Sequence, residues 1–500
     1  MVLVAVVLVA VASAFARDVP VSTVAELRAA VQAAQPGDVI LLADGTYAFD
    51  QGGWALDCAA AGSEAQPIVV RAVNPRQARI ELGNAASGSV VEGFHVSGPH
   101  WRVEGLDVRG TCADDSACEH AFHVVGGAVG FVLRGNRIVD FNAQLKVNAD
   151  GDHRLPDGGL VEGNEVFDTR ARQTGNPVTK LNIDNASGWV VRDNLLYDFH
   201  KVGGVSYGAF HKGGSQDPVF ERNLVLCAWH DTGGDTRIGL SFGGGGMGAG
   251  LCPPWDGSDC NPETVGGVMR NNIVIQCSDV GIYLNEAQDT RLLHNTLVET
   301  TGVDFRFATS TGEAHGNVLS SVIRTRDGAS FTGDDNLTGV AAADFAAWYA
   351  NPLEGDLRLR GDVSALLDRG GATAGVADDF CGRVRTDGRY DWGALEHSLG
   401  DCEDGADGSD GSDGSDGSDG SDGSDDVDDG SDDGSDGSDG SDGSDGSDGS
   451  DGADGSDGSD TADHATLSGS CGCGAGGATS LSLGLLALAC LALARSRRRA

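Results

Sequence analysis

Residues 178–229 read VTKLNIDNASGWVVRDNLLYDFHKVGGVSYGAFHKGGSQDPVFERNLVLCAW and contain the same unit twice. Each unit begins with a short strand in which apolar and polar residues alternate. Turn residues rich in Gly, Ser and Asp follow, and the unit ends in an apolar run that encloses an Asn. The two runs are Val190–Tyr197 and Val219–Leu226, and they begin 29 residues apart. A repeat of this length is typical of one coil of a solenoid.

The unit recurs on both sides of this stretch, and its Asn marks the period. Successive Asn residues are 28, 30, 29, 49, 23 and 22 positions apart. They are Asn136, Asn164, Asn194, Asn223, Asn272, Asn295 and Asn317. One unit cannot bury its apolar face alone, whereas stacked units can. We expect each Asn to lie at a tight bend, because Asn tolerates left-handed backbone angles. We also expect the stacked Asn side chains to hydrogen-bond along the solenoid.

This repeat resembles the right-handed parallel β-helix of the pectin-lyase-like superfamily, from about Val21 to Glu396. An antiparallel sandwich with regular strands is the alternative, but it does not explain the repeated Asn. The resemblance implies an all-β fold, a right-handed parallel β-helix solenoid with an N-terminal capping helix. A disordered acidic tail and a C-terminal apolar helix are expected to follow it.

The first part of the chain contains a leader and the predicted β-helix. Residues 1–16 are apolar and end in an A-x-A sequence, which is typical of a signal-peptide cleavage site. Residues 17–400 form the predicted β-helix domain. Within it, Ser22-Thr23 can cap a helix over 24–31 that covers the end of the solenoid. The opening at 36–47 resembles that of chondroitinase-B and alginate-lyase-type β-helices, which supports the fold and export.

Residues 401–467 form an acidic linker of Gly-Ser-Asp triplets. The chain has a formal charge of −41, and 24 Asp and one Glu fall between 401 and 463, a stretch without Lys or Arg. This linker lacks the apolar residues that would offset its ordering entropy, so we expect disorder. A calcium-binding β-roll is the alternative, but it needs an apolar residue in each repeat. The remaining acids still outnumber the bases, which argues against nucleic acid as a partner.

Residues 468–500 resemble the myxobacterial C-terminal sorting signal. They contain Cys471 and Cys473, an apolar stretch at 478–494 and a terminal Arg cluster. The resemblance implies a sorting protease as a partner, whereas a permanent anchor is the alternative. Both interpretations place 478–494 at a membrane, with the Arg cluster on the cytoplasmic side. We therefore expect a secreted monomer that is attached to the cell surface or outer membrane.

The cysteines suit an exported protein, because disulfides persist in oxidising compartments. We predict the disulfides Cys112–Cys118, Cys227–Cys277, Cys252–Cys260 and Cys381–Cys402. Cys227 and Cys277 each follow a repeat Asn, and neighbouring strands about 4.8 Å apart bring such residues within reach. Metal clusters are the alternative, but the β-helix contains no C-x-x-C pair. Cys58 is left without a partner.

Strand alternation assigns the polar residues near the centre of the repeat to the inside or the outside. The expected inward residues are Leu181, Ile183, Phe210 and Leu240. The expected outward residues are Lys180, Asn182, Asp184, His211 and Ser241. The coil before, residues 145–150, repeats 179–184 in residue type. We therefore expect three stacked pairs, which are Lys146 with Lys180, Asn148 with Asn182, and Asp150 with Asp184.

Stacked lysines lower each other's pKa, and a lowered pKa suits a base that takes the C5 proton of a uronic acid residue. The resemblance adds that β-helix lyases of this superfamily use Lys or Arg as the base. The candidate catalytic residues are Lys180, Lys146, His211, Lys212 and Arg237. The candidate substrate-binding residues are Asn148, Asn182, His123, Asn285 and Arg306. Asp150 and Asp184 suit a calcium ion, which is a hard cation that takes oxygen ligands.

The sequence thus predicts a protein that acts on polysaccharide, and the first hypothesis is a lyase that cleaves uronic-acid-containing glycans by β-elimination. Two alternatives stay open, a non-catalytic glycan-binding or adhesive surface protein and a structural spacer. The motifs of polygalacturonase-type hydrolases do not occur, and neither does the Arg-x-Pro-x-x-Arg of the major pectate lyases. The Gly-rich run at 243–250 opens no helix, so it does not predict a phosphate loop.

Overall fold

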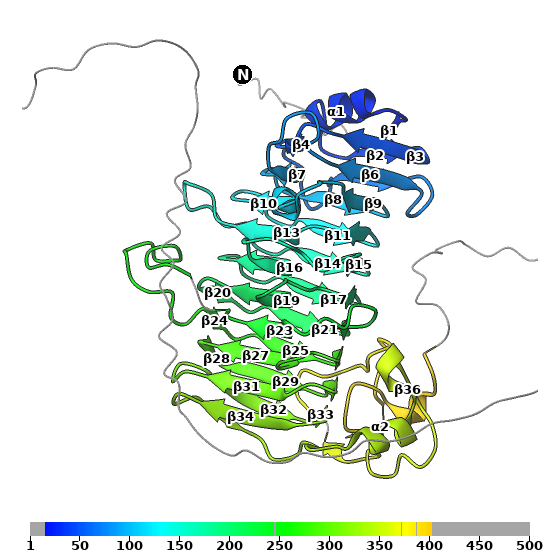
Figure 1. Ribbon diagram of the computed structural model, residues 1–500, viewed down its shortest axis with the longest axis vertical. Helices are drawn as coiled ribbons and strands as arrows, with labels where there is room; N and C mark the ends of the chain where they lie inside the picture. The colour runs from blue at the N-terminus through cyan, green and yellow to red at the C-terminus, as the bar shows by residue number, and fades with distance from the viewer. Residues whose placement is uncertain (1–15, 245–246, 372, 387, 403–500) are drawn as a thin grey trace, which may run out of the picture. The chain divides into compact units, whose positions relative to one another are not determined.

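Three long parallel sheets dominate the structure. The computed structural model describes residues 16–402, apart from 245–246, 372 and 387 (Figure 1). The predicted signal peptide, acidic linker and C-terminal segment therefore lie outside the described residues. Within the described part, no helix is long and apolar enough to cross a membrane. The described residues belong to one compact unit, and a second unit, residues 415–500, lies outside them.

In each of the three sheets, the order of the strands in space follows their order along the chain. Sheet A contains β1 (Arg17–Val21), β2 (Asp38–Leu42), β5 (Ile68–Ala72), β8 (Trp101–Glu104), β11 (Val132–Arg134), β14 (Leu160–Glu162), β17 (Val190–Arg192), β21 (Val219–Glu221), β25 (Val268–Arg270), β29 (Thr290–Leu293), β32 (Thr311–His315) and β35 (Ser330–Thr332). Sheet B contains β3 (Gly45–Phe49), β6 (Ala78–Leu82), β9 (Asp107–Gly110), β12 (Arg137–Val139), β15 (Glu165–Phe167), β18 (Leu195–Tyr197), β22 (Leu224–Leu226), β26 (Ile273–Ile275), β30 (Thr296–Val298) and β33 (Val318–Leu319). Sheet C contains β4 (Gly53–Cys58), β7 (Val91–Val96), β10 (His120–Val125), β13 (Ala143–Asn148), β16 (Val178–Asp184), β19 (Val205–Lys212), β23 (Thr236–Phe242), β27 (Ile282–Asn285), β31 (Gly302–Arg306) and β34 (Val322–Arg326).

The smaller elements lie at the edges and the ends. A short parallel sheet contains β20 (Ser215–Gln216), β24 (Thr264–Val265) and β28 (Ala287–Gln288). The helices are α1 (Val24–Gln32), α2 (Ala342–Trp348) and the 3-10 turns η1 (Asp115–Ala117), η2 (Pro352–Glu354) and η3 (His397–Leu399). Two antiparallel pairs follow β35, and they are β36 (Tyr349–Asn351) with β37 (Asp356–Leu359) and β38 (Gly370–Gly371) with β39 (Arg389–Tyr390).

The chain passes through sheets A, B and C in turn, and each passage makes one coil. Every strand pairs in parallel with its counterpart one coil away, for example β14 with β17. One apolar residue of each short strand points into the common interior, as Val161, Val166 and Leu181 do. Stacking these residues produces one continuous core along the solenoid. The predicted right-handed parallel β-helix is therefore confirmed.

The repeated Asn residues form a buried ladder at the bend between sheets A and B. Each Nδ2 donates to the Oδ1 of the next Asn over 2.8–3.0 Å, from Asn136 to Asn336. The predicted stacking is confirmed. The left-handed angle belongs instead to the preceding residue, such as Gly135 (φ 66°), Asp193 (φ 57°) and His294 (φ 52°). The prediction for Asn itself is wrong, because the preceding residue makes the turn while the Asn side chain points inward.

Helix α1 covers the N-terminal end of the solenoid. Thr23 accepts a hydrogen bond from the Glu26 backbone, and Glu26 accepts one from the Thr23 backbone, so α1 begins with a capping box. Leu27 and Val31 of α1 join the core at the end of the solenoid, as predicted. The segment after β35 packs against the outer face of sheet B instead, where Phe345 of α2 lies in one apolar cluster with residues of β22, β26 and β30.

All four predicted disulfides are present, Cys112–Cys118, Cys227–Cys277, Cys252–Cys260 and Cys381–Cys402. The Cα atoms of Cys227 and Cys277 are 4.9 Å apart on neighbouring coils, which confirms the register predicted around the 49-residue interval. Within the described residues, Cys58 is the cysteine left outside a disulfide, and it is buried.

Candidate functional site

The charged residues on the outer face of sheet A form ion pairs with one another. Arg and Glu alternate on its outer face in register over seven coils, as Arg71, Glu104, Arg134, Glu162, Arg192, Glu221 and Arg270. Glu162, for example, lies 2.5 Å from Arg134 Nε and 2.5 Å from Arg192 Nη2. A ligand that bound here would have to displace these pairs.

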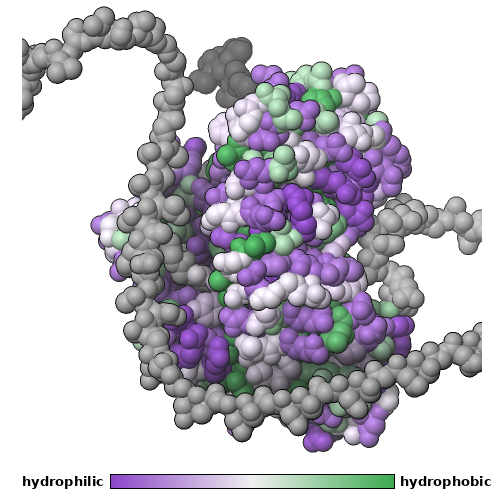
Figure 2. Space-filling model, in the orientation of Figure 1, coloured by the Kyte–Doolittle hydropathy of each residue, from purple (hydrophilic) through white to green (hydrophobic). Residues whose placement is uncertain are grey.

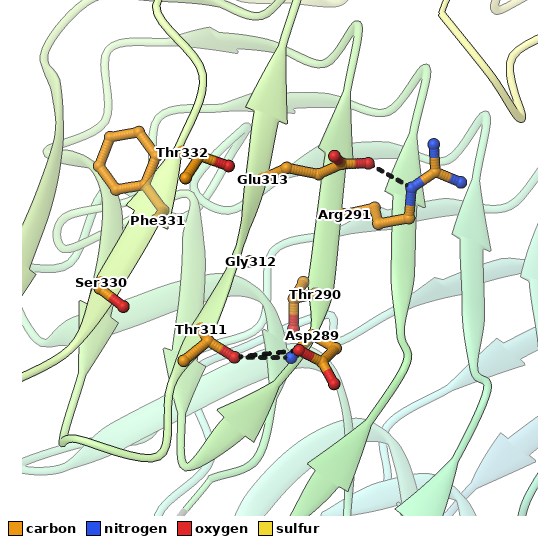
Figure 3. A pocket seen from close by; sticks show the side chains of 9 residues that line it. All are labelled: Asp289, Thr290, Arg291, Thr311, Gly312, Glu313, Ser330, Phe331 and Thr332. Atoms are coloured by element: carbon orange, nitrogen blue, oxygen red, sulfur yellow. Dashed lines mark hydrogen bonds and ion pairs between the residues drawn. The ribbon is translucent and has the colours of Figure 1, made fainter.

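A shallow depression of about 430 Å³ continues sheet A across β29, β32 and β35 (Figure 3). Threonines, Ser330 and Phe331 line much of it. Its Arg291 is paired with Glu313 over 2.6 Å, so the charge of this arginine is also compensated. The segment after β35 covers part of sheet B, and the charges on sheet A are already paired. The outer face of sheet C is therefore the better candidate for a functional site.

Lys146 projects from the outer face of sheet C. The register places it between His123 of β10 and Asn182 of β16. Its ammonium donates to Asn182 Oδ1 over 3.1 Å and also to Asp184. The side chain remains 19% exposed, so solvent reaches this cation. Lys146 therefore combines a positive charge with neighbouring amide and carboxylate groups on an open face.

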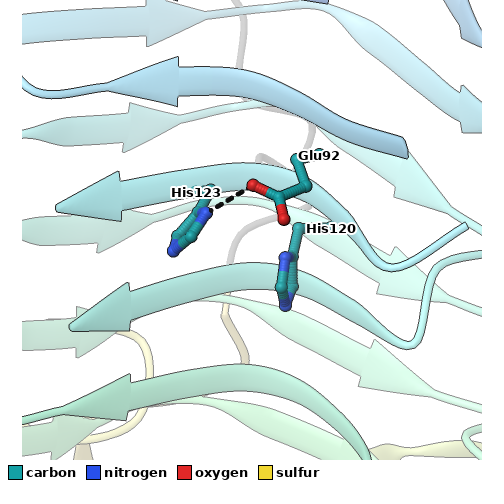
Figure 4. Close-up of side chains that lie close together, drawn as sticks. All are labelled: Glu92, His120 and His123. Atoms are coloured by element: carbon teal, nitrogen blue, oxygen red, sulfur yellow. Dashed lines mark hydrogen bonds and ion pairs between the residues drawn. The ribbon is translucent and has the colours of Figure 1, made fainter. Parts of the chain in front are cut away.

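A cluster of three side chains lies beside Lys146 (Figure 4). Glu92 comes from β7, and His120 and His123 come from β10. His123 Nδ1 lies 2.9 Å from Glu92 Oε2, and His123 Nε2 lies 2.9 Å from Asn148 Oδ1. The hydrogen bond from His123 lowers the pKa of Glu92 to about 2, and burial lowers the pKa of His120 to about 3. Titratable groups perturbed to this degree are typical of functional sites.

Several buried polar atoms on the strands of sheet C have no hydrogen-bond partner within the described part of the chain. They include His120 Nδ1, Gln144 Oε1, Asp184 Oδ1, His211 Nε2, Asn285 Oδ1 and Arg324 Nε. Such atoms are rare in folded proteins, and a ligand, an ion or water commonly explains them. This observation also favours sheet C as the functional face. On the face seen in Figure 2, hydrophilic residues predominate and hydrophobic ones are scattered, which suits a polar ligand.

Lys180 does not project from this face, so the predicted orientation is wrong. It lies at the start of β16, where the chain bends from β15 into sheet C, and it is fully buried. Its ammonium lies 2.6 Å from Asp168 Oδ2 and donates to the Phe141 carbonyl over 2.7 Å. The predicted stacking of Lys146 on Lys180 fails for the same reason, because Lys146 pairs with Asn182, two residues further on.

His211 is also misplaced in the prediction, by one residue. The register pairs Asn182 with Phe210 and Ile183 with His211, so Phe210 takes the outer side and His211 the inner side. A one-residue slip exchanges the two faces of a strand. His211 is fully buried, its Nδ1 lies 2.6 Å from Ser215 Oγ, and burial lowers its pKa to about 3.

The two other predicted catalytic residues lie in different surroundings. Lys212 is the register partner of Asp184, and its ammonium lies 4.8 Å from the centroid of the Phe210 ring. It therefore belongs to the same face as Lys146. Arg237 of β23 is 1% exposed. It lies 3.2 Å from Asp231, which belongs to the bend before this strand. Arg237 supports that loop and does not project from the face.

The predicted substrate-binding residues divide into two groups. His123, Asn148 and Asn182 surround Lys146, since His123 contacts Asn148 and Lys146 donates to Asn182. Asn285 and Arg306 lie on β27 and β31, and both contact the Tyr283 hydroxyl, over 3.1 and 3.3 Å. Four strand spacings separate β27 from β13, or about 19 Å at 4.8 Å per strand. The second group could contact only a distant part of a long ligand.

The predicted calcium ligands each hold a cation from the protein itself. Asp150 accepts hydrogen bonds from the backbone of Asp152 and Arg154 and pairs with the Arg154 side chain over 2.6 Å. Asp184 pairs with Lys146. The predicted stacking of Asp150 on Asp184 and of Asn148 on Asn182 is wrong, because Val147 pairs with Ile183 and Lys146 with Asn182. The residues as placed do not fit a calcium cage, so calcium has no part in the proposed chemistry. Calcium binding stays a prediction.

Two loops project beside this face on the same side of the solenoid (Figure 1). One follows β13 and contains His153, and the other is the insertion after β23 that contains Trp255. The two rings stack with centroids 4.3 Å apart. The insertion is tied down by the Cys252–Cys260 disulfide and by a hydrogen bond of 3.0 Å from Asn185 Nδ2 to the Leu251 carbonyl. The stacked rings thus join the two loops to each other.

Comparisons with known proteins agree with the fold. No protein-family model matches the chain, and no curated protein sequence matches it. The pectate lyase Pel9A matches in structure with a TM-score of 0.50 and 17% identity, over 74% of this chain and 90% of its own. A rhamnogalacturonan lyase matches with a TM-score of 0.47 and 14% identity, over 68% and 92%. An alginate lyase from Paenibacillus sp. FPU-7 matches with 0.39 and 17%, over 63% and 99%.

The likeness to Pel9A, at this level of identity, shows the fold alone. The chain folds as a parallel β-helix, as Pel9A does. The function must be argued from its own residues.

The sequence prediction missed Glu92, His120 and Trp54. The pair His120 and His123 was visible as His-x-x-His, a spacing that places the two side chains on opposite sides of an ideal strand. The start of β7 is irregular, since Gly93 has φ 47° and the register between β4 and β7 shifts there. Trp54 is 54% exposed, and its ring stacks on His95 with centroids 3.6 Å apart.

Proposed function

We propose that this protein is a surface-displayed polysaccharide lyase that cleaves uronic-acid-containing glycans by β-elimination on the outer face of sheet C. The observation that carries the proposal is the position of Lys146, a partly exposed cation that donates to Asn182 and Asp184 beside perturbed titratable groups. The exposed Trp54 ring lies on the same sheet and offers an apolar surface for a sugar.

Lys146 and Lys212, on the two strands that flank Asp184, have different roles in the proposed reaction. The Lys146 ammonium is the cation that binds the uronate carboxylate and stabilises the negative charge that develops there. Lys212, the register partner of Asp184, takes the C5 proton. The C4–O4 bond then breaks, the C4–C5 double bond forms, and the departing O4 takes a proton from solvent. Asn182 and Asn148 orient the sugar by hydrogen bonding.

The test is a screen of the purified chain against alginate, pectate, chondroitin and heparin, followed by the ultraviolet absorbance of the unsaturated product. On an active substrate, Lys146→Ala should lower kcat by about 10²–10³-fold and Lys212→Ala by about 10²–10⁴-fold. Lys201→Ala, which changes a lysine on a loop away from this face, is the matched control and should keep full activity. Full kcat in Lys146→Ala would overturn the assignment.

A non-catalytic glycan-binding protein is the second candidate, and one observation favours it. Lys146 and Asp184 neutralise each other, so the face is balanced in charge, as expected of a surface that only binds. In that case no unsaturated product would form on any polymer. The chain would still be retained on one of them, and Trp54→Ala would weaken the retention.

We also propose a location outside the cell, at the cell surface or outer membrane. The four disulfides within residues 16–402 support this location, because such bonds persist in oxidising compartments. The proposed sorting protease and the membrane contact at 478–494 concern residues beyond the described part. Digestion of intact cells with an added protease tests the location, since a surface protein is cut and an internal one is protected.

A further inference from the structure

We propose that Glu92, His120 and His123 form a binding site for a divalent transition-metal ion of the Zn²⁺ class. Each residue offers one ligand atom, and these atoms lie within 4.8 Å of one another (Figure 4). All three side chains are partly exposed, at 33%, 13% and 18% respectively, so an ion can enter from solvent. Two imidazoles and one carboxylate, with a further position open to water, are an established ligand set for Zn²⁺.

The hydrogen bonds of His123 require a cation beside it. Asn148 Nδ2 donates to the Ala149 carbonyl over 2.7 Å, which fixes Asn148 Oδ1 as the atom facing His123 Nε2. Because Oδ1 can only accept, Nε2 carries the proton. His123 Nδ1 then faces Glu92 Oε2 at 2.9 Å, and two lone pairs this close need a positive charge between them. Either a second proton or a metal ion supplies that charge.

His120 decides between the two. Its Nδ1 is buried and has no hydrogen-bond partner among the described residues, and its ring lies 5.0 Å from that of His123. A proton on His123 would leave His120 Nδ1 unsatisfied. A metal ion bound by all three residues satisfies His120 and fills the gap between His123 and Glu92 at once. One ligand therefore accounts for two independent features of the structure.

Neighbouring groups hold the three ligands in place, as is usual around a metal site. Asn148 orients the His123 ring, and Trp54 Nε1 donates to Glu92 Oε2 over 3.2 Å. Glu119 Oε1 lies 4.0 Å from His120 Nε2, beyond hydrogen-bond distance, and places a negative charge near this ring. Gly93 lets β7 approach β10, since a Cβ there would lie 2.1 Å from the Ala121 carbonyl oxygen.

The ligand set also selects the class of ion. Imidazole favours Zn²⁺, Co²⁺, Ni²⁺ and Cu²⁺, whereas Ca²⁺ and Mg²⁺ prefer sites made of oxygen alone. Lys146 is the nearest competing cation on the next strand, and Asp184 compensates it. Because Lys146 is the register partner of His123, an ion bound there would lie near this lysine and could take an anionic oxygen such as a uronate carboxylate. That last step rests on the proposed function, whereas metal binding does not.

The test titrates the full chain, first stripped with a chelator, with Co²⁺ and follows the visible absorption of the bound ion, with Zn²⁺ as a competitor. The Asp-rich residues beyond 402 are the same in every variant, so differences between variants report this site. Wild type should show a Co²⁺ spectrum that Zn²⁺ abolishes, and His120→Ala and His123→Ala should lose it. Asn148→Ala should weaken binding by about 10–100-fold, because it removes a supporting group while keeping the ligands. His230→Gln, which changes a histidine whose side chain is 64% exposed, is the control and should bind as wild type does.

Circular dichroism of each variant separates loss of metal from loss of fold. If a histidine variant does not fold, Asn148→Ala and Glu92→Gln decide the question. A wild-type chain without a Co²⁺ spectrum would overturn the proposal, and so would equal affinity in wild type, Asn148→Ala and Glu92→Gln. Metal binding without cleavage of any polysaccharide would refute the proposed lyase and leave this site standing. Cleavage by a chain that binds no metal would do the reverse.

Discussion

Lys180→Met removes one half of a buried ion pair and tests how β16 is placed. The Lys180 ammonium lies 2.6 Å from Asp168 Oδ2, and both side chains are 0% exposed. The ammonium also donates to the Phe141 carbonyl over 2.7 Å. Methionine is similar in length to lysine, so the change removes the charge with little change in packing. Asp168 is then left as a buried carboxylate without its nearest cation.

Breaking a buried ion pair costs about 3–5 kcal/mol. We expect the lower end, about 3 kcal/mol, because Arg172 also acts electrostatically on Asp168 and remains in place. Burial raises the pKa of Asp168 and lowers the pKa of Lys180, so the loss of solvation outweighs the attraction within the pair. Replacing both partners with apolar residues should then be nearly neutral. The double variant Lys180→Met/Asp168→Leu should therefore recover most of the lost stability.

Urea unfolding of wild type, the two single variants and the double variant measures these free energies as a cycle. Lys201→Met is the matched control, since Lys201 lies at the surface, where its ammonium donates to the Gly175 carbonyl over 3.3 Å. It should change the free energy of unfolding by less than about 0.5 kcal/mol. If Lys180→Met unfolds at the same urea concentration as wild type, Lys180 is exposed and its inward placement is wrong.

Three further predictions concern the fold. Asn194→Ala should lower the free energy of unfolding, measured with urea, by about 2–5 kcal/mol, because it leaves the Asn164 backbone amide and the Val161 carbonyl without partners. Asn74 is exposed, so Asn74→Ala is the control, and equal stability of the two variants would contradict the ladder's role. Replacing Cys227 and Cys277 with Ala should lower the free energy of unfolding by about 4 kcal/mol, because this disulfide closes a loop of 50 residues. Replacing Cys252 and Cys260, which close a loop of 8 residues, should lower it by about 2.5 kcal/mol. A larger loss for the second pair than for the first would refute this estimate. Burial lowers the pKa of His211 and of His294 to about 3. Since the unfolded histidines take up protons below about pH 6.5, the free energy of unfolding should fall as the pH drops from 6.5 towards 3. A urea midpoint that stays constant over this range would disprove this prediction.

The sequence predicts those features of the fold that depend only on which coil a residue belongs to. The spacing of the repeated Asn predicts the coils and their ladder, and it places Cys227 beside Cys277 across an insertion of unknown shape. These predictions need only the coil that a residue belongs to. They do not depend on where the chain bends within a coil.

Assigning a residue to the face of a strand needs the register within the coil, and residue types alone do not fix it. Lys146 and Lys180 belong to similar stretches, but the bend before β16 moves Lys180 into the interior, and Lys146 pairs with Asn182. Phe210 and His211 exchange faces through a slip of one residue. Glu92 escapes prediction because the irregular start of β7 breaks the alternation that a pattern could detect.

The outer faces of sheets A and C differ in how completely their polar groups are matched, and this difference argues for function on sheet C. On sheet A, each ladder carboxylate from Glu104 to Glu221 already has arginines on both sides, so a ligand must break pairs before it gains any. On sheet C, folding leaves atoms such as His120 Nδ1 and Asp184 Oδ1 without partners among the described residues. Each such atom costs the fold about 1–3 kcal/mol. A ligand or ion that completes these bonds recovers that free energy on binding, so affinity is more readily gained on sheet C than on sheet A.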